Sequence, residues 1–273
     1  MNSKLEQKMK DAILDSTTYS GVKFSKSKTL SASGLNDDIL PLVLKYRHGL
    51  GSQKVIEQNT LGTLLHSGLE NAFNGHKDYG VEKSFKMPIG DTGWSLTGHV
   101  DLIDFDSNAI IDHKMLKTKK INEIMMMSQP KKKLEDWDDY QWQLGVYKLL
   151  AETKYGKTFE SYISAFNKET SYFKKDADEV SFRLIPIVTP TNEEVMAKAI
   201  SQVNEIKKYI DDNNDNEPSQ CSNLFFSLKY GKPARPMRCR KFCDNSNHCT
   251  YYQKFAYHRK KASASDLLSK LGI

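Results

Sequence analysis

Residues 98–114 read GHVDLIDFDSNAIIDHK, and this stretch decides the fold. Two runs rich in Val, Leu, Ile and Phe flank the triplet Asp106-Ser107-Asn108, which has the composition of a tight turn. Apolar runs of this length, separated by so short a turn, are typical of two antiparallel strands. The sequence therefore predicts a β-hairpin whose arms extend over residues 94–105 and 109–115.

Charged side chains interrupt both arms of this hairpin. Asp101 lies on the first arm; Asp112 and Lys114 end the second, two residues apart and hence on one face of the strand. Burying charge among apolar residues is costly unless the charge is paired or bound to a metal ion. Two carboxylates suit a hard cation such as Mg²⁺ or Mn²⁺. The lysine is then placed to orient an attacking water or to offset charge on phosphorus. The alternative is an ordinary exposed hairpin with scattered charges.

Outside the hairpin, helical and strand patterns follow one another. Apolar periodicity predicts helices at 4–14, 31–46, 61–73, 140–154, 192–211 and 265–271, and further strands at 81–87, 161–167 and 180–188. The polar, lysine-rich residues 117–137 are expected to form a mobile segment with at most a short helix. This order predicts an α/β (α+β) fold with a helical N-terminal part, in which helices flank a mixed central sheet. We expect one domain at 1–215 and a cysteine-containing basic tail at 216–273, packed on that domain.

The composition is that of a folded protein with a nearly balanced surface. Of 273 residues, 38% are hydrophobic and 10% aromatic, and 40 basic against 34 acidic side chains give a net charge of +6. This excess permits a polyanionic partner without requiring one. No run approaches the ~20 apolar residues that span a bilayer, and the N-terminus lacks the apolar run of a secretory signal. We therefore expect a cytoplasmic protein with no membrane partner.

Four short motifs occur in order between residues 62 and 147. They are Gly62-Thr63-Leu64-Leu65-His66, Gly98-His99-Val100-Asp101, Ile110-Ile111-Asp112-His113-Lys114 and Gln143-Leu144-Gly145-Val146-Tyr147. Each motif alone is common, but together they resemble the RecB-like branch of the PD-(D/E)xK nuclease superfamily in order and interval. The resemblance implies a restriction-endonuclease-like core and a metal-dependent nuclease.

The resemblance also implies a role for each residue that matches a motif. His66 would be a metal ligand delivered from the helix before the sheet, and Asp101 and Asp112 would be the carboxylate ligands. The backbone carbonyl of His113 would be available to the ion, and Lys114 would be the catalytic lysine. A lone histidine beside a leucine stripe is more often a core residue, but the three accompanying motifs favour a ligand.

Gln143 and Tyr147 match the Q-x-x-x-Y motif of the same branch, which is expected to hold the site together or to contact the nucleic-acid backbone. Their spacing of four residues places both on one helix face, where each can donate to phosphate oxygens. The side chain of His113 is expected on the opposite side of its strand from Asp112 and Lys114, and we do not assign it to catalysis.

Four cysteines follow the predicted nuclease core. Four thiolates can bind Zn²⁺ or an iron–sulfur cluster, and some RecB-like nucleases carry a [4Fe–4S] cluster. In those proteins the first cluster cysteine precedes the histidine motif, where this sequence has Leu40. Either Cys221 replaces that ligand, or the site holds zinc, or the thiols bind no metal; His248 is a further candidate ligand. The cysteines are Cys221, Cys239, Cys243 and Cys249.

Lysines cluster directly after the second arm of the hairpin. Lys117, Lys119 and Lys120 are expected to contact DNA, and Lys131-Lys132-Lys133 follow in the same polar segment. Attraction of this cluster to a phosphodiester backbone would depend strongly on salt. The alternative is an ordinary solvated loop.

These observations lead to one expected function and two alternatives. We expect a Mg²⁺- or Mn²⁺-dependent deoxyribonuclease; the resemblance implies an exonuclease on DNA ends or single strands, in recombination, repair or replication. The alternatives are a structure-specific endonuclease and a non-catalytic nucleic-acid-binding module. The sequence lacks the P-loop string G-x-x-x-x-G-K-[ST], so a helicase or recombination partner would be a separate protein.

Overall fold

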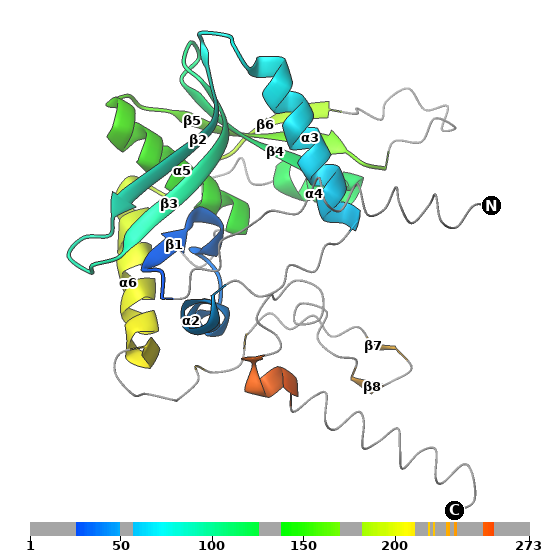
Figure 1. The fold of residues 1–273 in the computed structure, drawn as a ribbon. Helices are drawn as coiled ribbons and strands as arrows, with labels where there is room; N and C mark the ends of the chain where they lie inside the picture. The colour runs from blue at the N-terminus through cyan, green and yellow to red at the C-terminus, as the bar shows by residue number, and fades with distance from the viewer. Residues whose placement is uncertain are drawn as a thin grey trace, which may run out of the picture. The chain divides into compact units, whose positions relative to one another are not determined.

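The computed structural model describes most of the chain in two compact units, which are treated separately below (Figure 1). The first unit contains residues 28–36 and 57–204, and the second contains 26–27, 37–49 and the described residues from 205 onward. The described residues are 26–49, 57–125, 138–169, 182–210, 218, 221, 228–229, 232–233 and 248–253.

A mixed sheet forms the centre of the first unit (Figure 1). β2, β3 and β4 are antiparallel neighbours, β5 lies parallel to β4, and β6 pairs antiparallel with β5. The predicted mixed sheet and the predicted hairpin, which is β3–β4, are confirmed. In the described part of the chain this sheet has six strands: β1 (Thr29–Ser31), β2 (Tyr79–Pro88), β3 (Ser95–Asp104), β4 (Ala109–Leu116), β5 (Glu160–Asn167) and β6 (Phe182–Pro186).

The turn of the β3–β4 hairpin is fixed by its own polar residues. The Asp104 carboxylate accepts hydrogen bonds from the backbone N–H groups of Asp106 and Ser107, at 3.0 and 3.3 Å. Asn108 completes the turn with a φ of 50°, in the left-handed region that asparagine tolerates better than most residues.

One edge of β3 is only partly paired. β2 runs along the other edge from Ser95 to Asp104. On the partly paired edge, β1 pairs in parallel with residues 95–97, and β4 pairs with residues 102–104. β4 then leaves β3 and continues in register with β5 as far as Leu116. The sheet therefore forks beside residues 98–101, where the Gly98–Asp101 motif lies.

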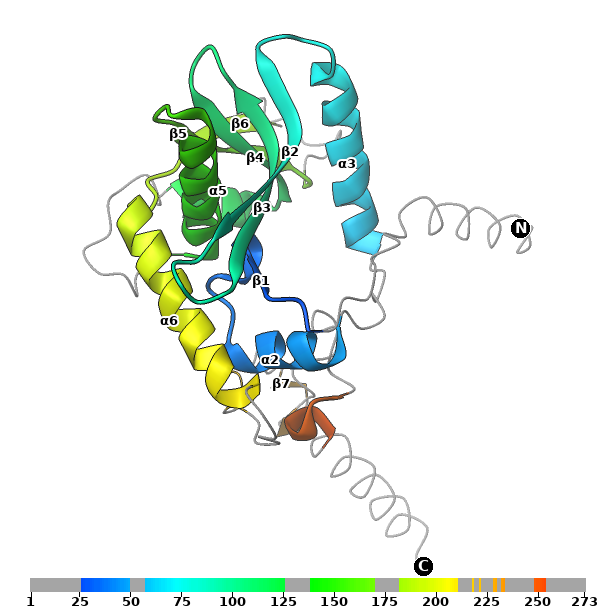
Figure 2. The same ribbon diagram turned by 60° about the vertical axis from the view of Figure 1, so that its left-hand side comes forward.

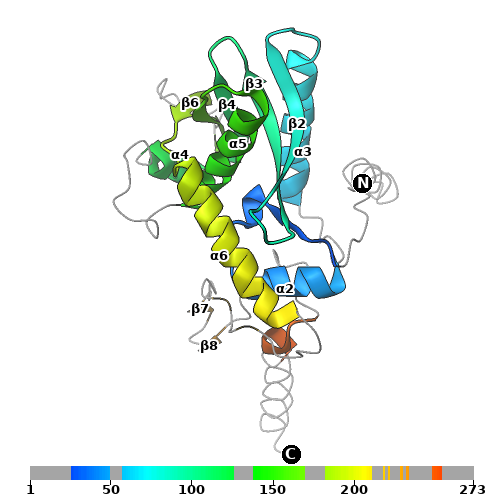
Figure 3. The same ribbon diagram turned by 90° about the vertical axis from the view of Figure 1, so that its left-hand side faces the viewer.

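Two helices, α3 (Glu57–Phe73) and α5 (Asp139–Tyr155), cover opposite faces of this sheet, as Figures 2 and 3 show. The sequence defines both ends of α5. Asp138 and Gln141 form a reciprocal capping box at its start, and Gly156 ends it with a φ of 64°. The apolar residues predicted to face the core from this helix, Trp142, Val146, Leu149 and Leu150, are all buried.

Glycines set how closely α5 approaches its neighbours. A β-carbon at Gly98 on β3 would lie 2.7 Å from Cδ1 of Leu150 and 3.0 Å from Cδ1 of Tyr147. A β-carbon at Gly145 on α5 would lie 3.0 Å from Cγ2 of Val195 on α6 (Asn192–Ile210). The glycine of the Gly98–Asp101 motif therefore permits the close packing of α5 on β3.

The second unit is built around α2 (Ile39–His48). Its small core joins Leu40 and Leu44 to Cys249, with Cys221, Tyr251 and Tyr252 packed against this cluster. The rings of His48 and His248 stack with centroids 4.1 Å apart. Two short antiparallel strands, β7 (Leu228–Lys229) and β8 (Lys232–Pro233), also belong to this unit.

The predicted single helix at 31–46 is wrong in its first part. Residues 29–31 form β1, a 3₁₀ turn covers Ala32–Gly34, and α2 begins only at Ile39. The physical reason is that Leu30, 1% exposed, pairs with β3, while Gly34 and the polar residues 36–38 interrupt the helix. The short helix expected in 117–137 is present as α4 (Thr118–Met125).

Several expectations fall outside the described residues. They are the helices at 4–14 and 265–271, and the domain boundary at 215, which stays a prediction. None of the described helices is long and apolar enough to cross a membrane.

Candidate functional site

The fork in the sheet brings Asp101 next to the Asp112–Lys114 segment. Because the β3–β4 ladder ends at Leu102 and Ile111, the backbone N–H of His113 has no strand partner on that side. It donates instead to Oδ2 of Asp101, at 2.8 Å. Residues predicted to meet across the hairpin therefore do so through a direct hydrogen bond, and both carboxylates are buried: Asp101 is 7% exposed and Asp112 1%.

His66 reaches the same place from α3. Its Nδ1 lies 3.5 Å from Oδ1 of Asp101, and its Nε2 lies 3.1 Å from the backbone carbonyl oxygen of His113. Three of the groups that the resemblance implies as metal ligands are thus direct neighbours. The histidine is half-buried on a helix that contacts β2 and β4, so it is not a core residue.

A second cluster surrounds the other carboxylate, that of Asp112. The Lys114 ammonium lies 2.8 and 2.7 Å from its two oxygens, which confirms that the two side chains share a face. Gln143 of α5 donates from Nε2 to Oδ1 of Asp112 at 3.3 Å and to the Tyr147 hydroxyl at 2.8 Å. The two helix residues therefore lie on one face, as predicted, and hold the carboxylate from that side.

The electrostatics of the site favour a cation. Burial, followed by the charge of Asp112, raises the pKa of Asp101 to about 6. Burial by itself would lower the pKa of Lys114, but the adjacent Asp112 carboxylate outweighs it, and the pKa is raised. Lys114 is therefore an ammonium at neutral pH and can act as a hydrogen-bond donor and positive charge, not as a base. One ammonium faces two buried carboxylates, which leaves negative charge for a metal ion to neutralise.

The side chain of His113 turns away from Asp112. Its Nδ1 lies 2.6 Å from Oγ of Ser164 on β5, and burial lowers the pKa of the ring to about 4, so it is neutral at physiological pH. Its ring lies edge-on to His66 with centroids 6.0 Å apart. The histidine thus offers the site its backbone, as expected, while its ring packs beside His66.

Glu82 on β2 was not identified from the sequence. One ligand atom from each of His66, Glu82 and Asp101 can be chosen so that all three lie within 4.8 Å of one another. Within the described chain this compact group does not include Asp112. Glu82 has a φ of 49°, unusual for a non-glycine residue in a strand, and such local strain is common at functional sites.

His99 holds the Glu82 carboxylate through an ion pair, and its Nδ1 lies 2.8 Å from Oγ of Ser84. The hydrogen bond from His99 lowers the pKa of Glu82 and raises that of His99. No sequence pattern places Glu82 here, since only the pairing of β2 with β3 brings it to the motif residues.

The donor set fits a divalent cation. Two carboxylates, an imidazole and a backbone carbonyl from the residues above are oxygen and nitrogen ligands that Mg²⁺ and Mn²⁺ accept. The carbonyl of His113 and the ring of His66 already contact each other, so these donors are assembled without large rearrangement.

The three predicted DNA-contacting lysines lie just beyond the site, on α4 and the residue before it. Lys117 lies 3.5 Å from Glu169, and Lys119 and Lys120 lie 4.0 and 3.5 Å from Glu123. Tyr140 was also missed from the sequence: its ring lies 5.9 Å from the Lys114 ammonium and 5.4 Å from that of Lys120. It therefore connects the site to the lysine cluster.

The predicted cysteine site is only partly described. Cys239 and Cys243 lie outside the described residues, while Cys221 and Cys249 pack against Leu40 and Leu44 in the second unit. Leu40 thus neighbours two of the four cysteines. The occupant of this site stays a prediction.

A family model matches residues 62–226, more than half of the chain, and describes a PDDEXK-like domain of unknown function (DUF3799). The chain belongs to this family. The PDDEXK-like domain places it in the PD-(D/E)xK nuclease superfamily, as the motifs predicted. The matched residues include the whole carboxylate–lysine site, from His66 to Tyr147.

Solved structures are similar to this PDDEXK-like chain at low identity. One, described as the crystal structure of SSO0001, is 15% identical, with a TM-score of 0.48 over 90% of this chain and 96% of the other. Another, a candidate exonuclease from Eubacterium rectale, is 14% identical, with a TM-score of 0.33 over 55% of this chain and 53% of the other. No curated protein matches the sequence.

Proposed function

We propose that this protein is a Mg²⁺- or Mn²⁺-dependent deoxyribonuclease of the RecB-like branch. The observation that carries the proposal is the convergence of His66, Asp101 and the carbonyl of His113 at the fork, next to the ion pair of Asp112 with Lys114. A bound divalent ion and a fixed ammonium can together stabilise the charge that develops during phosphodiester hydrolysis.

The metal would be held by Asp101, Asp112, His66 and the carbonyl of His113, with the Glu82 carboxylate close to His66 and Asp101 as a further candidate ligand. When bound, the ion supplies Lewis-acid polarisation of the scissile phosphate. Lys114 donates hydrogen bonds to a phosphate oxygen or to the attacking water, and its charge offsets the negative charge that develops on phosphorus.

Gln143 acts as a positioning residue in this proposal. Its amide fixes the Asp112 carboxylate at 3.3 Å, and the Tyr147 hydroxyl fixes the amide in turn. Because Asp112 orients Lys114, this series of hydrogen bonds determines the position of the Lys114 ammonium. Small displacements of such groups carry large costs in rate.

The proposed substrate is DNA with a free end or a single strand, cleaved as an exonuclease in recombination, repair or replication. The lysines beside the site support a polyanionic substrate, since they offer several cations to one backbone. The alternative function is that of a structure-specific endonuclease.

The test uses end-labelled linear DNA and circular single-stranded DNA, each with Mn²⁺ or with EDTA. We expect degradation of the linear strand only with Mn²⁺, and a loss of about 100-fold or more in rate for Asp112→Ala and Lys114→Ala. Lys86→Ala, an exposed lysine on β2, is the matched control and should cut at the parent rate.

Circular dichroism shows whether each variant is folded. Folded Asp112→Ala and Lys114→Ala proteins that cut at the parent rate would contradict the proposed site. Linearisation of the circular strand would identify an endonuclease, while binding without any cleavage by the parent would identify a non-catalytic module.

A further inference from the structure

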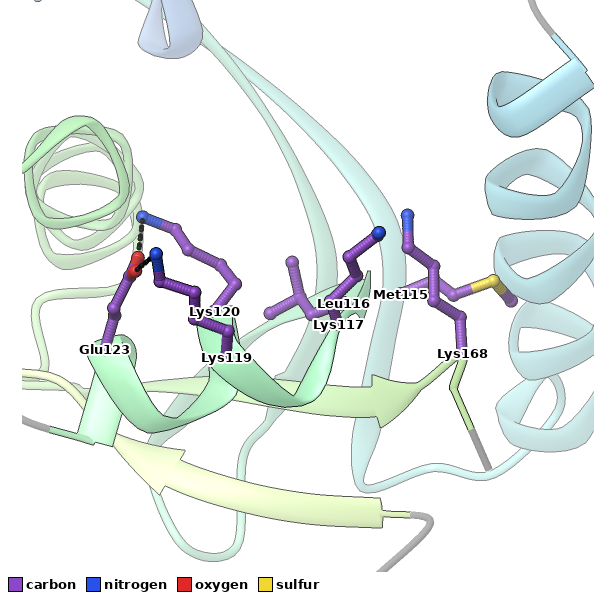
Figure 4. A pocket seen from close by; sticks show the side chains of 7 residues that line it. All are labelled: Met115, Leu116, Lys117, Lys119, Lys120, Glu123 and Lys168. Carbon is purple, nitrogen blue, oxygen red and sulfur yellow. Dashed lines mark ion pairs between the residues drawn. The ribbon is translucent and has the colours of Figure 1, made fainter. Parts of the chain in front are cut away.

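A pocket lined mainly by lysines lies just beyond the proposed catalytic lysine. Its volume is about 290 Å³, and its charged lining consists of Lys117, Lys119, Lys120, Lys168 and Glu123 (Figure 4). Two residues at the end of β4 supply the rest of the lining. Four cations therefore face one anion in a pocket large enough for a phosphate group.

The topology of the sheet explains why these lysines gather. β4 and β5 are parallel and end in register at Leu116 and Asn167, so Lys117 and Lys168 follow at adjacent positions. The backbone N–H of Lys168 extends the ladder by donating to the carbonyl of Leu116 at 2.9 Å. In Figure 4 the two side chains project in the same direction. Ligands commonly bind at the carboxyl ends of parallel strands, where the pocket lies.

The charges within the pocket are not balanced. Glu123 is shared between Lys119 and Lys120, at 4.0 and 3.5 Å, and Lys120 also lies 3.8 Å from the carboxylate of Asp138. Lys168 has no ion-pair partner among the described residues. With Glu169, which lies 3.5 Å from Lys117, three carboxylates accompany these four lysines, so positive charge is left over that a phosphate would offset.

Glu169 already provides an anion at the edge of this pocket. Its carboxylate accepts a hydrogen bond from the backbone N–H of Thr118 at 3.0 Å, at the start of α4, and lies 3.5 Å from the Lys117 ammonium. A helix N-terminus plus a lysine is a donor set that proteins use for phosphate. The Glu169 side chain is 42% exposed, so an incoming phosphate can replace it.

The pocket also lies within reach of the proposed site. Lys114 and Lys120 contact the same Tyr140 ring at 5.9 and 5.4 Å, so their ammonium groups are at most about 11 Å apart. Phosphates on one strand advance by about 3.4 Å per nucleotide along a duplex axis, so this separation corresponds to at most about three nucleotides.

We propose that this pocket binds one phosphate group of the nucleic-acid strand whose scissile phosphate lies at Lys114, and that Glu169 occupies the edge of the pocket until that strand binds. This inference rests on the proposed function, which supplies the nucleic-acid strand as the substrate. The phosphate is either an internal phosphodiester or a terminal phosphate monoester, and the substrates below distinguish the two.

The test measures binding of a labelled single-stranded oligonucleotide to the full chain in EDTA, where no cleavage occurs, over a series of salt concentrations. We expect Lys117→Gln/Lys168→Gln to weaken binding about fivefold or more and to reduce the slope of log K against log salt by about 1. The control is Lys154→Gln/Lys157→Gln, which removes two exposed lysines at the far end of α5 and should bind like the parent. Equal binding by the two double variants would overturn the proposal, as would a parent that does not bind the strand.

Glu169→Gln tests whether the Glu169 carboxylate competes with the phosphate for the pocket. Removing its charge should strengthen binding about two- to fivefold, the range that an exposed ion pair supports. Glu160→Gln, an exposed glutamate on β5, should leave binding unchanged. Unchanged or weaker binding by Glu169→Gln would overturn the role of Glu169.

Oligonucleotides with 5′-phosphate, 3′-phosphate or hydroxyl ends identify the phosphate. A preference for one phosphorylated end that disappears in Lys117→Gln/Lys168→Gln assigns a terminal phosphate. Equal binding of all three, with the same loss in the variant, assigns an internal phosphodiester. Cleavage in Mn²⁺ is measured separately: a parent that binds through the pocket but does not cut refutes the proposed function alone, and a parent that cuts while the pocket variant matches its control refutes this inference alone.

Discussion

The carboxylate of Asp101 is buried near a second carboxylate, that of Asp112, and the Lys114 ammonium pairs with Asp112. In a protein selected for stability alone, one of these groups would be neutral or absent. Their retention at the fork is understandable if the site exists to attract a cation. At the residue scale, this arrangement is the one expected if the protein gives up some stability in order to bind a cation.

Asp101→Asn is expected to stabilise the metal-free protein. The folded-state pKa of about 6 lies above 3.8, the ordinary pKa of an aspartate, so ionising Asp101 disfavours the folded state at higher pH. Asparagine removes that charge and keeps an oxygen for the N–H of His113. At about pH 8 in EDTA, the free energy of unfolding should rise by about 1–2 kcal/mol, and the gain should shrink as the pH falls from about 6 towards 4.

Urea denaturation at several pH values measures this difference, with Asp91→Asn, an exposed loop residue, as the control. Excess Mn²⁺ should reverse the order, because the parent binds the ion more tightly. A variant that is less stable than the parent in EDTA at high pH would show that the two carboxylates do not repel each other as argued.

Glu82 gives a second prediction at the residue scale. If its strained backbone exists to bring a carboxylate to His66 and Asp101, Glu82→Gln should weaken Mn²⁺ binding about tenfold, as the loss of a supporting group at a metal site does. Calorimetric titration with Mn²⁺ measures the affinity without reference to cleavage. Glu193→Gln, exposed on α6, is the control. An affinity equal to that of the parent would leave Glu82 as a structural partner of His99 only.

At the scale of elements, the fit of α5 against β3 depends on the missing side chain of Gly98. Gly98→Ala should force the Tyr147 ring outward and destabilise the protein by about 1–3 kcal/mol, the usual cost of overpacking. Thermal unfolding measures this cost. Gly68→Ala on α3, where an added β-carbon meets nothing within 4 Å, should instead stabilise the helix by about 0.5–1 kcal/mol.

The two alanine variants thus have opposite expected signs. A Gly98→Ala protein as stable as the parent would mean that α5 moves away without cost. In that case the Gln143 amide would move away from Asp112 together with α5, and Gly98→Ala should lose cleavage activity although its stability is unchanged.

Elements with a strong periodic pattern were predicted well from the sequence. The β3–β4 hairpin and α5 have long apolar runs, a turn of suitable composition and defined helix caps, so local information suffices. β1 was missed because its three residues, Thr29–Ser31, have no periodicity of their own and become a strand only by pairing with Ser95–Thr97. Ser31, the last residue of β1, resembled a helix start for the same reason.

The candidate site shows the same division. His66, Asp101, Asp112 and Lys114 lie in motifs that the resemblance supplied, and the structure brings them together. Glu82, Tyr140 and Lys168 belong to no motif. Strand pairing and helix packing bring them to their positions, and neither can be inferred from the residues taken one at a time.

At the scale of the whole molecule, the chain passes between the two units more than once. β1 belongs to the first unit, α2 to the second, and α3 returns to the first before the residues from 205 onward complete the second. Every residue of the proposed site and of the lysine pocket comes from the first unit. The net charge of +6 is small, so any attraction to a strand must come from local clusters such as that pocket, not from the molecule as a whole.

The packing of α2 has a consequence for how the protein is made. Among the described residues, Leu40 and Leu44 form a core cluster with Cys249, against which Cys221, Tyr251 and Tyr252 pack, all far later in the sequence. A ribosome releases the strands of the first unit long before that cysteine emerges, so α2 waits with an uncovered face while its neighbours fold. Nascent chains in this state are prone to aggregate or to recruit chaperones, and premature termination before Cys249 would leave that face uncovered for good.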